Sequence, residues 1–221
     1  MAKSTGPSAF TGFPVAALDF YDDLEADNTK SFWEANKPVY DEAVRAPMTA
    51  LMESLAPEFA PDHKSVKIFR PYRDVRFSKD KTPYKTAQGA FIQTAPASGF
   101  YLQLGAGGVL TGAGFYDADA ARLAAFRDAI VDEATGTKLA RIITKLEKAG
   151  FTRGGDTLKT SPRGYDADHP RIDLLRHKSL TLGRDLGFGP EISTPGLLDQ
   201  VREDWRKLRP FVDWIVANTG A

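Results

Sequence analysis

Three segments between residues 89 and 116 alternate apolar residues with polar or small ones, and this pattern restricts the fold more than any other feature. The segments are 89–94, 100–105 and 109–116. Alternation with a period of two places apolar side chains on one face of an extended strand. The GAGG sequence at 105–108 suits the tight turn of a hairpin. An antiparallel meander is therefore predicted, with a further strand at 66–77.

Apolar residues at helical spacing predict helices before and after these strands. In the N-terminal region Pro47 is predicted to kink or split a helix. In the central region Gly136 is predicted to end a helix, and the C-terminal helix is predicted to kink or restart at Pro210. The predicted fold is α+β, a single domain over residues 14–221 with a mainly antiparallel sheet of about four to six strands. N-terminal, central and C-terminal helices flank the sheet, and residues 1–13 are expected to form a flexible arm.

The composition of the 221 residues is that of a soluble globular protein, with 42% hydrophobic and 26% charged residues. The chain has no cysteine, which excludes disulfides, thiolate metal sites and cysteine nucleophiles. No apolar run approaches the roughly 18–20 residues that cross a bilayer, and the N-terminal sequence MAKSTGPSAFTG lacks the apolar core of a signal peptide. We therefore predict a cytoplasmic protein that is not bound to a membrane.

The stretch from Lys67 to Lys85 carries seven basic and two acidic residues in a chain of zero net charge. Its first half is predicted to be a strand that turns Phe69, Val75 and Phe77 toward the core, with a bulge near Pro71. Its second half, SKDKTPYK, has the composition of a loop. Such a surface attracts phosphate, carboxylate or a nucleic acid backbone.

Two other interpretations of this stretch remain open. A charged edge strand and a solvated loop prevent aggregation without binding anything. Residues 15–63 carry eleven acidic and three basic residues, so the basic stretch could also pair with these acidic helices inside the fold.

A second polar segment, SPRGYDADHPRIDLLRHKSL at 161–180, contains His169 and His177. The two histidines lack the i, i+4 spacing of a helical zinc site, so no metal is predicted. The chain has no G-x-S-x-G nucleophile motif, and GAGG lacks the residues and context of a phosphate or dinucleotide loop, so no cofactor is predicted. Asp80, Asp168 and His169 could act together as acid and base if the two loops meet.

Four segments resemble an uncharacterised domain-of-unknown-function family found mainly in bacteria. They are RDVRFSKDKTPYK at 73–85, NTKSFWEANKPVYDEAV at 28–44, GFYLQLGAGGVLTGAGFY at 99–116 and the segment at 161–180, of which RFSKDKTPYK and GYDADHP are the signatures. The resemblance runs from about Phe10 to the last helix. It implies a single α+β domain. The family has no established activity, so the resemblance transfers no catalytic role to any residue.

The function predicted from these features is binding of an anionic, phosphate-bearing ligand by the basic stretch. The predicted ligand-binding residues are Arg70, Arg73, Arg76, Lys79, Lys81, Tyr84 and Lys85, with Arg163, Tyr165 and Arg171 on the opposite wall. One alternative is a metal-independent hydrolase or transferase that uses Asp80, Asp168 or His169. Another is a structural or partner-binding module. Nucleic acid is a weaker candidate ligand, because the sequence pI is about 6.8, and the sequence leaves the oligomeric state open.

Overall fold

The computed structural model describes residues 9–220, apart from the side chain of His63. Its helices are α1 (Val15–Ala26), α2 (Lys30–Val39), a π-helix (Tyr40–Arg45), α3 (Ala46–Phe59), α4 (Ala120–Val131), α5 (Glu133–Lys148), α6 (Ile172–Leu175) and α7 (Gly196–Thr219), with short 3₁₀ turns at His63–Ser65 and Pro190–Ser193. Its strands are β1 (Val66–Ile68), β2 (Ala87–Ala95), β3 (Ser98–Gly105), β4 (Gly108–Phe115), β5 (Thr152–Gly154) and β6 (Leu180–Gly187).

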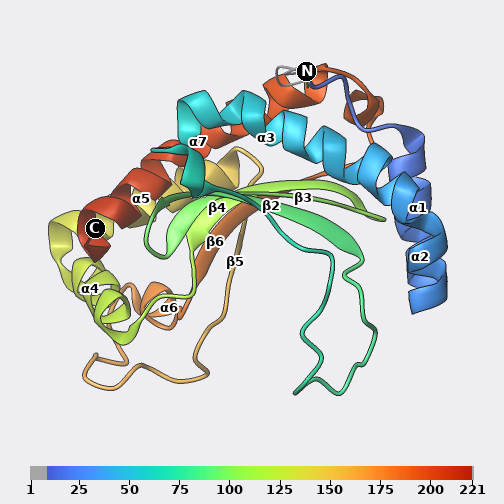
Figure 1. Cartoon of the computed structure of the whole chain (residues 1–221). Helices are drawn as coiled ribbons and strands as arrows, with labels where there is room; N and C mark the ends of the chain where they lie inside the picture. Colours follow the sequence, from blue (N-terminus) through green and yellow to red (C-terminus); the bar gives the residue numbers. More distant parts are fainter. Residues whose placement is uncertain (1–8, 221) are drawn as a thin grey trace. The chain divides into compact units, whose positions relative to one another are not determined.

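The strands form one six-stranded antiparallel sheet in the order β1-β2-β3-β4-β6-β5, drawn in Figure 1. The predicted meander is present as β2, β3 and β4, and the GAGG turn joins β3 to β4. The predicted α+β class is confirmed. The predicted strand at 66–77 is shorter than expected, because β1 ends at Ile68.

The contacts within the chain gather into two compact units, each described by itself below. Unit 1 comprises residues 9–92, 102–110 and 185–202, and unit 2 comprises residues 93–101, 111–184 and 203–220. The single domain expected over 14–221 stays a prediction.

An aromatic cluster forms the core of unit 1. The ring of Trp33 from α2 lies 5.8 Å from that of Phe20 in α1 and 4.8 Å from that of Tyr40 in the π-helix. The interruption predicted at Pro47 occurs just before it, where the N–H of Ala46 donates to the carbonyl of Asp41 in a π-type bond. Pro47 itself lies in the first turn of α3, directly after the π-helix, and has no N–H to continue the helical hydrogen bonding.

The predicted flexible arm at residues 1–13 is corrected for its last residues, and residues 1–8 lie outside the described part. Phe10 and Phe13 are buried in unit 1, and the N–H of Phe13 donates to the carbonyl of Ile192 over 2.8 Å. Gly12 allows this close approach with φ +112°, because a Cβ there would lie 2.3 Å from the Ser193 carbonyl carbon. Burial of the two rings gives this segment a fixed position.

Stacked aromatic rings form the core of unit 2. Phe115 stacks on Phe126 of α4 at 4.6 Å, and Phe100 stacks on Trp205 of α7 at 5.1 Å. The indole N–H of Trp214 donates to the carbonyl of Thr135 and ties α7 to α5. Helix α7 continues through Pro210, so the predicted restart there does not occur.

The prediction that Gly136 ends a helix is wrong. The break lies at Asp132, whose carboxylate caps α5 by accepting from the N–H of Thr135, and Gly136 is inside α5. Gly136 is needed for contact rather than for a break. A Cβ there would lie 2.1 Å from the carbonyl oxygen of Ile130 and 2.6 Å from Nε of Arg171.

We expect Gly136→Ala to destabilise the protein by about 1–3 kcal/mol, because overpacking at a backbone carbonyl outweighs the higher helix propensity of alanine. Urea unfolding measures the change. Gly107→Ala is the matched control, because a Cβ at Gly107 would meet nothing within 4 Å. Equal stability of the two variants would contradict the assigned contact.

Candidate functional site

The basic stretch leaves the sheet as a long irregular hairpin between β1 and β2, which Figure 1 shows extending away from these strands. We call residues 67–85 the basic arm. Its two sides stay paired outward from the sheet. Phe69 N–H donates to the carbonyl of Gly89, Lys85 N–H to that of Pro71 and Arg73 N–H to that of Pro83.

The two prolines explain why the predicted strand stops early. Pro71 and Pro83 accept through their carbonyls but have no N–H to donate, so each pair has one hydrogen bond instead of two. The pairing also changes register, because Phe69 is opposite Gly89 whereas Pro71 is opposite Lys85. The predicted bulge is therefore present near Pro71, with three residues (86–88) on the opposite side of the hairpin facing the single residue Arg70.

Gln88 fills the bulge and is buried. Its side-chain amide donates to the carbonyls of Phe69 and Gly89, over 2.8 and 2.7 Å. Its oxygen accepts from the hydroxyl of Tyr40 over 2.5 Å. All polar atoms of this buried side chain thus have partners, which fixes the bulge to the helices of unit 1.

Asn28 and Trp33 hold the base of the arm through Tyr84. The Asn28 amide acts as a strand partner, donating to the carbonyl of Tyr84 and accepting from its N–H, each over 3.1 Å. Trp33 stacks on the Tyr84 ring at 4.4 Å with an interplanar angle of 10°. Tyr84, a predicted ligand contact, is 5% exposed, whereas Tyr72, bridged to it across the arm, is 48% exposed. The accessible aromatic side chain of this pair is therefore Tyr72.

Most charges at the tip of the arm are compensated within the arm. The Arg73 guanidinium donates to Asp80 over 2.5 Å and also to the hydroxyl of Thr82. Arg76 donates to both carboxylate oxygens of Asp74, over 2.9 and 2.6 Å. These pairs are local, and within the described residues no arm cation forms an ion pair with residues 15–63.

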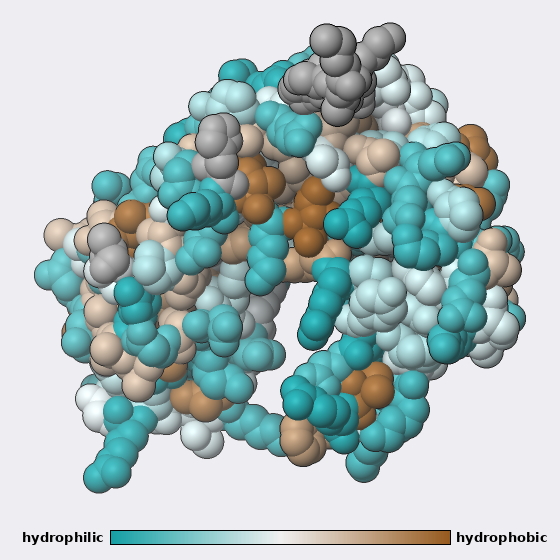
Figure 2. Space-filling model, in the orientation of Figure 1, coloured by the Kyte–Doolittle hydropathy of each residue, from teal (hydrophilic) through white to brown (hydrophobic). Residues whose placement is uncertain are grey.

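The tip also carries two lysines and an exposed phenylalanine. Lys81 donates to the carbonyl of Val75, while Lys79 is exposed and makes no polar side-chain contact with the described residues. Phe77, predicted to face the core, is 96% exposed because the strand that would have buried it ends at Ile68. Figure 2 shows the arm as mostly hydrophilic surface with a small hydrophobic part.

Asp80 is a poor general base at neutral pH. Hydrogen bonds from the Thr82 backbone, from Arg73 and from the Thr82 hydroxyl lower the pKa of its carboxyl to about 2. A carboxylate stabilised in this way has little tendency to accept a proton, whereas an effective base titrates near the working pH.

The cations at the base of the arm have a different environment. The ammonium groups of Lys67 and Lys85 lie 5.6 and 5.4 Å from the ring centroid of Phe69. Burial first, and then the charges of Arg70 and Lys67, lower the pKa of Lys85, so the three cations are close enough to repel one another. Within the described part of the chain, none of these three cations forms an ion pair with a carboxylate. Arg70 is, however, near enough to Asp74 to contribute to the lowered pKa of that carboxyl.

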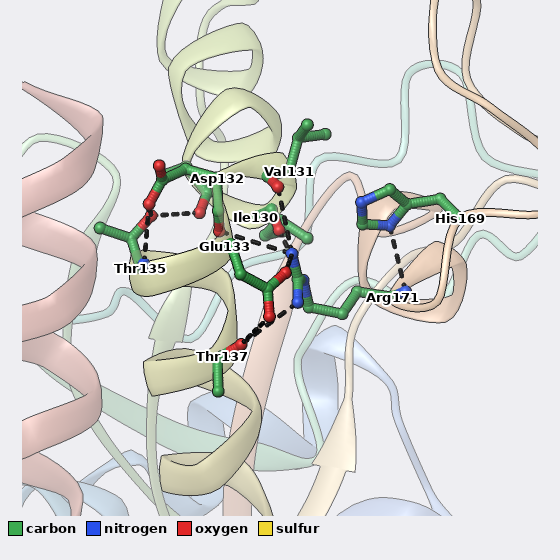
Figure 3. A network of polar contacts seen from close by, with 9 residues as sticks. Ile130, Val131, Asp132, Glu133, Thr135, Thr137, His169 and Arg171 are labelled. Carbon is green, nitrogen blue, oxygen red and sulfur yellow. Dashed lines mark hydrogen bonds and ion pairs between the residues drawn. The ribbon is translucent and has the colours of Figure 1, made fainter.

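The second polar segment, residues 161–180, belongs to unit 2, and much of its polarity holds its own unit together. Arg171 donates to the carbonyls of Ile130 and Val131 at the end of α4, over 2.8 and 3.1 Å, and to Glu133 over 2.9 Å. Figure 3 shows this guanidinium at the α4–α5 junction, with His169 accepting from the Arg171 N–H. Arg171 therefore satisfies carbonyls that the end of a helix leaves free.

The remaining predicted residues of this segment have fewer contacts. The hydroxyl of Tyr165 donates to Asp128 over 2.8 Å. The N–H of Asp168 donates to the side chain of Asp166. Arg163 is exposed without a polar side-chain contact to the described residues. These residues and the basic arm belong to different units, so their role as an opposite wall stays a prediction.

His177 is buried, and its Nδ1 lies 2.8 Å from the carbonyl of Ser179, which requires a proton on that nitrogen. Burial is the main cause that lowers its pKa. A neutral imidazole held by a backbone carbonyl is a packing element.

Within the described residues, no group of three or more histidine or acidic side chains could hold a metal ion, and no helix has the length and apolar character needed to span a bilayer.

The family comparison covers both polar segments. The match to the family described as "Conserved hypothetical protein (DUF2461)" extends over residues 16–214. The chain belongs to this family. No curated protein and no solved structure matched the chain.

Sequence reasoning missed Asn28, Trp33 and Lys67 as members of the site. Asn28 and Trp33 lie in a segment that carries the family resemblance, but Asn28 contacts a residue 56 positions away. A contact between residues so far apart in the chain cannot be predicted from the spacing of residue types. Lys67 could have been predicted, because it lies two residues before Phe69 and alternate residues of an extended chain share a face.

We expect Asn28→Ala to loosen the arm, because it removes two partly buried hydrogen bonds to Tyr84 at a cost of about 1–3 kcal/mol. Limited digestion with trypsin should then cleave the arm faster than in the parent protein. Asn36→Ala is the matched control, since that amide only donates to the carbonyl of Phe32 within the same helix. Equal cleavage rates in all three proteins would contradict the anchoring role.

His177 predicts a pH dependence of stability. Its folded pKa is lowered, so the unfolded chain takes up the proton first as the pH falls below about 6.5. The stabilisation from its neutral form is complete above that pH and is lost below it. Urea unfolding at pH 7.5 and 5.5 should show a smaller loss for His177→Gln than for the parent protein. Equal losses would contradict this assignment.

Proposed function

We propose that this protein binds a small phosphate-bearing ligand at the base of the basic arm, through Lys67, Arg70 and Lys85. The observation that supports it is that Lys67 and Lys85 both lie over Phe69, with Arg70 close enough to Lys85 to lower its pKa, and that none of the three has an ion-paired carboxylate among the described residues. Like charges held together destabilise the folded protein, and a bound anion would reverse this effect.

The three side chains suit a phosphate group in complementary ways. The planar guanidinium of Arg70 can donate two parallel hydrogen bonds to phosphate oxygens. The ammonium groups of Lys67 and Lys85 act as point charges that approach from other directions. The Phe69 ring lies beside both ammonium groups, and an apolar neighbour of this kind lowers the local dielectric and strengthens the electrostatic attraction.

This proposal narrows the set of residues predicted from the sequence. Arg73, Arg76 and Lys81 already donate to groups within the arm, so their charge or hydrogen-bonding capacity is partly used. Lys79 and Tyr72 are exposed and could contact a larger ligand beyond its phosphate. We place this activity in the cytoplasm, as the sequence predicted.

The two alternative functions have less support. A hydrolase or transferase that uses Asp80 would need a carboxyl able to accept a proton, and this one is held ionised. A module whose basic stretch pairs with the acidic helices would need ion pairs between them, whereas the paired tip residues use Asp74 and Asp80 of the arm itself.

Thermal unfolding against phosphate, pyrophosphate, nucleotides and sugar phosphates at fixed ionic strength tests the proposal. A ligand at 100 times its Kd adds about 2.7 kcal/mol of stability, which corresponds to roughly 5–10 °C in Tm for a chain of this size, at about 2–4 °C per kcal/mol. We expect one ligand class to give such a shift. No shift with any of these compounds would overturn the proposal.

Variants at the base and at the tip of the arm locate the site. We expect Lys85→Met to abolish the ligand-dependent shift while raising the Tm of the ligand-free protein, because the lowered pKa of Lys85 shows that its charged form is disfavoured in the folded state. Lys81→Met at the tip is the matched control and should keep most of the shift. Loss of the shift in the Lys81 variant alone would move the site to the tip.

A further inference from the structure

The exposed face of α5 carries a row of cations that the proposed phosphate site does not use. They are Lys138, Arg141, Lys145 and Lys148, all exposed. Their spacing of three, four and three residues places them on one side of a helix. The buried residues Leu139, Ile143 and Leu146 lie on the opposite side of α5.

None of these four cations forms an ion pair with a carboxylate within residues 9–220. The acidic residues of α5 bond to other partners, since Glu133 pairs with Arg171 and Glu147 with Arg153. Like charges at i, i+4, as at Arg141 and Lys145, destabilise an isolated helix by about 0.2–0.5 kcal/mol per pair. An exposed helix more often mixes both signs of charge, so this face is unusual.

The same face is hollowed into a shallow groove of about 510 Å³. Arg141, Lys145 and Lys148 line it together with Thr137 and Thr144. Lysine, arginine and threonine side chains are common contacts to the phosphates of a nucleic acid backbone. The groove thus offers positive charge and a hydroxyl group along one line.

We propose that the exposed face of α5 binds the phosphate backbone of a nucleic acid duplex without reading its sequence. Successive cations lie about one helical turn, 5.4 Å, apart, and a duplex presents a regular row of negative charges. No large hydrophobic side chain is exposed among the described residues of α5. That absence disfavours a bilayer surface or a protein hot spot, both of which need apolar anchors.

The choice of duplex over single strand follows from the side chains present. Single-strand binders stack bases on aromatic rings. Helix α5 has no aromatic residue, so it can hold a backbone but cannot stack bases. The zero net charge of the chain does not conflict with a local surface, because phosphate contacts act at short range in physiological salt.

Fluorescence anisotropy with labelled DNA and RNA duplexes of about 16 base pairs, a length that a duplex-binding module can span, tests this proposal on the full chain. We expect binding to weaken with salt, with a slope of log K against log salt that includes about −0.9 for each phosphate contact. Lys138→Gln, Arg141→Gln, Lys145→Gln and Lys148→Gln together should weaken binding at least about tenfold and lower the slope by about 1 per residue.

The control removes the same charge elsewhere. The control variant combines Lys30→Gln, Lys64→Gln, Lys159→Gln and Lys178→Gln. It should leave the salt slope unchanged, and Tm measurements check the folding of both variants. A variant with Arg70→Gln and Lys85→Met should also keep duplex binding, which separates this surface from the phosphate site.

Four results would overturn the proposal. The first is absence of duplex binding at about 50 mM salt, a concentration at which phosphate contacts are strong. The second is equal weakening of binding in the α5 variant and the control, and the third is loss of binding only in the arm variant. The fourth is tighter binding to polyglutamate or anionic lipid vesicles than to duplex. The last result would assign the face to an acidic protein or to a membrane surface.

Discussion

Tyr84 stacks on Trp33, and the Asn28 amide forms two hydrogen bonds with the Tyr84 backbone. These contacts fix the part of unit 1 on which the candidate phosphate site depends. A hairpin interrupted by Pro71 and Pro83 cannot continue a regular ladder of hydrogen bonds. Trp33 of α2 and Asn28 of the turn before it hold the hairpin through Tyr84 instead. The arm therefore starts from a defined position, and its cations lie on a fixed backbone.

Charge is distributed within the arm in two different ways. At the tip, Asp74 and Asp80 compensate Arg76 and Arg73, and exposed pairs of this kind contribute little to stability. At the base, burial first and then the charges of Arg70 and Lys67 lower the pKa of Lys85, so these cations repel one another. Folded proteins tend to retain unfavourable local interactions where function requires them. This contrast is the reason for locating the site at the base.

The segment at 161–180 illustrates how a polar sequence can serve the fold. Arg171 satisfies the carbonyls where α4 ends, and Gly136 leaves room for it. His177 is buried and neutral against a backbone carbonyl. The composition of this segment suggested chemistry, and its described contacts are those of a scaffold.

The sequence by itself determined the central strands and the α+β class. Alternation predicted β2, β3 and β4, because it depends on neighbours within a few residues. The sequence also identified the basic stretch as the place to look for an anion.

Only the tertiary structure decided which cations of that stretch are compensated. The bonds that decide it are side-chain contacts whose geometry follows from the folded arm, such as Arg73 with Asp80. The anchor between Asn28 and Tyr84 spans 56 residues. Composition and periodicity describe the neighbourhood of a residue along the chain, whereas electrostatic energy depends on distance in space, and folding alone sets that distance.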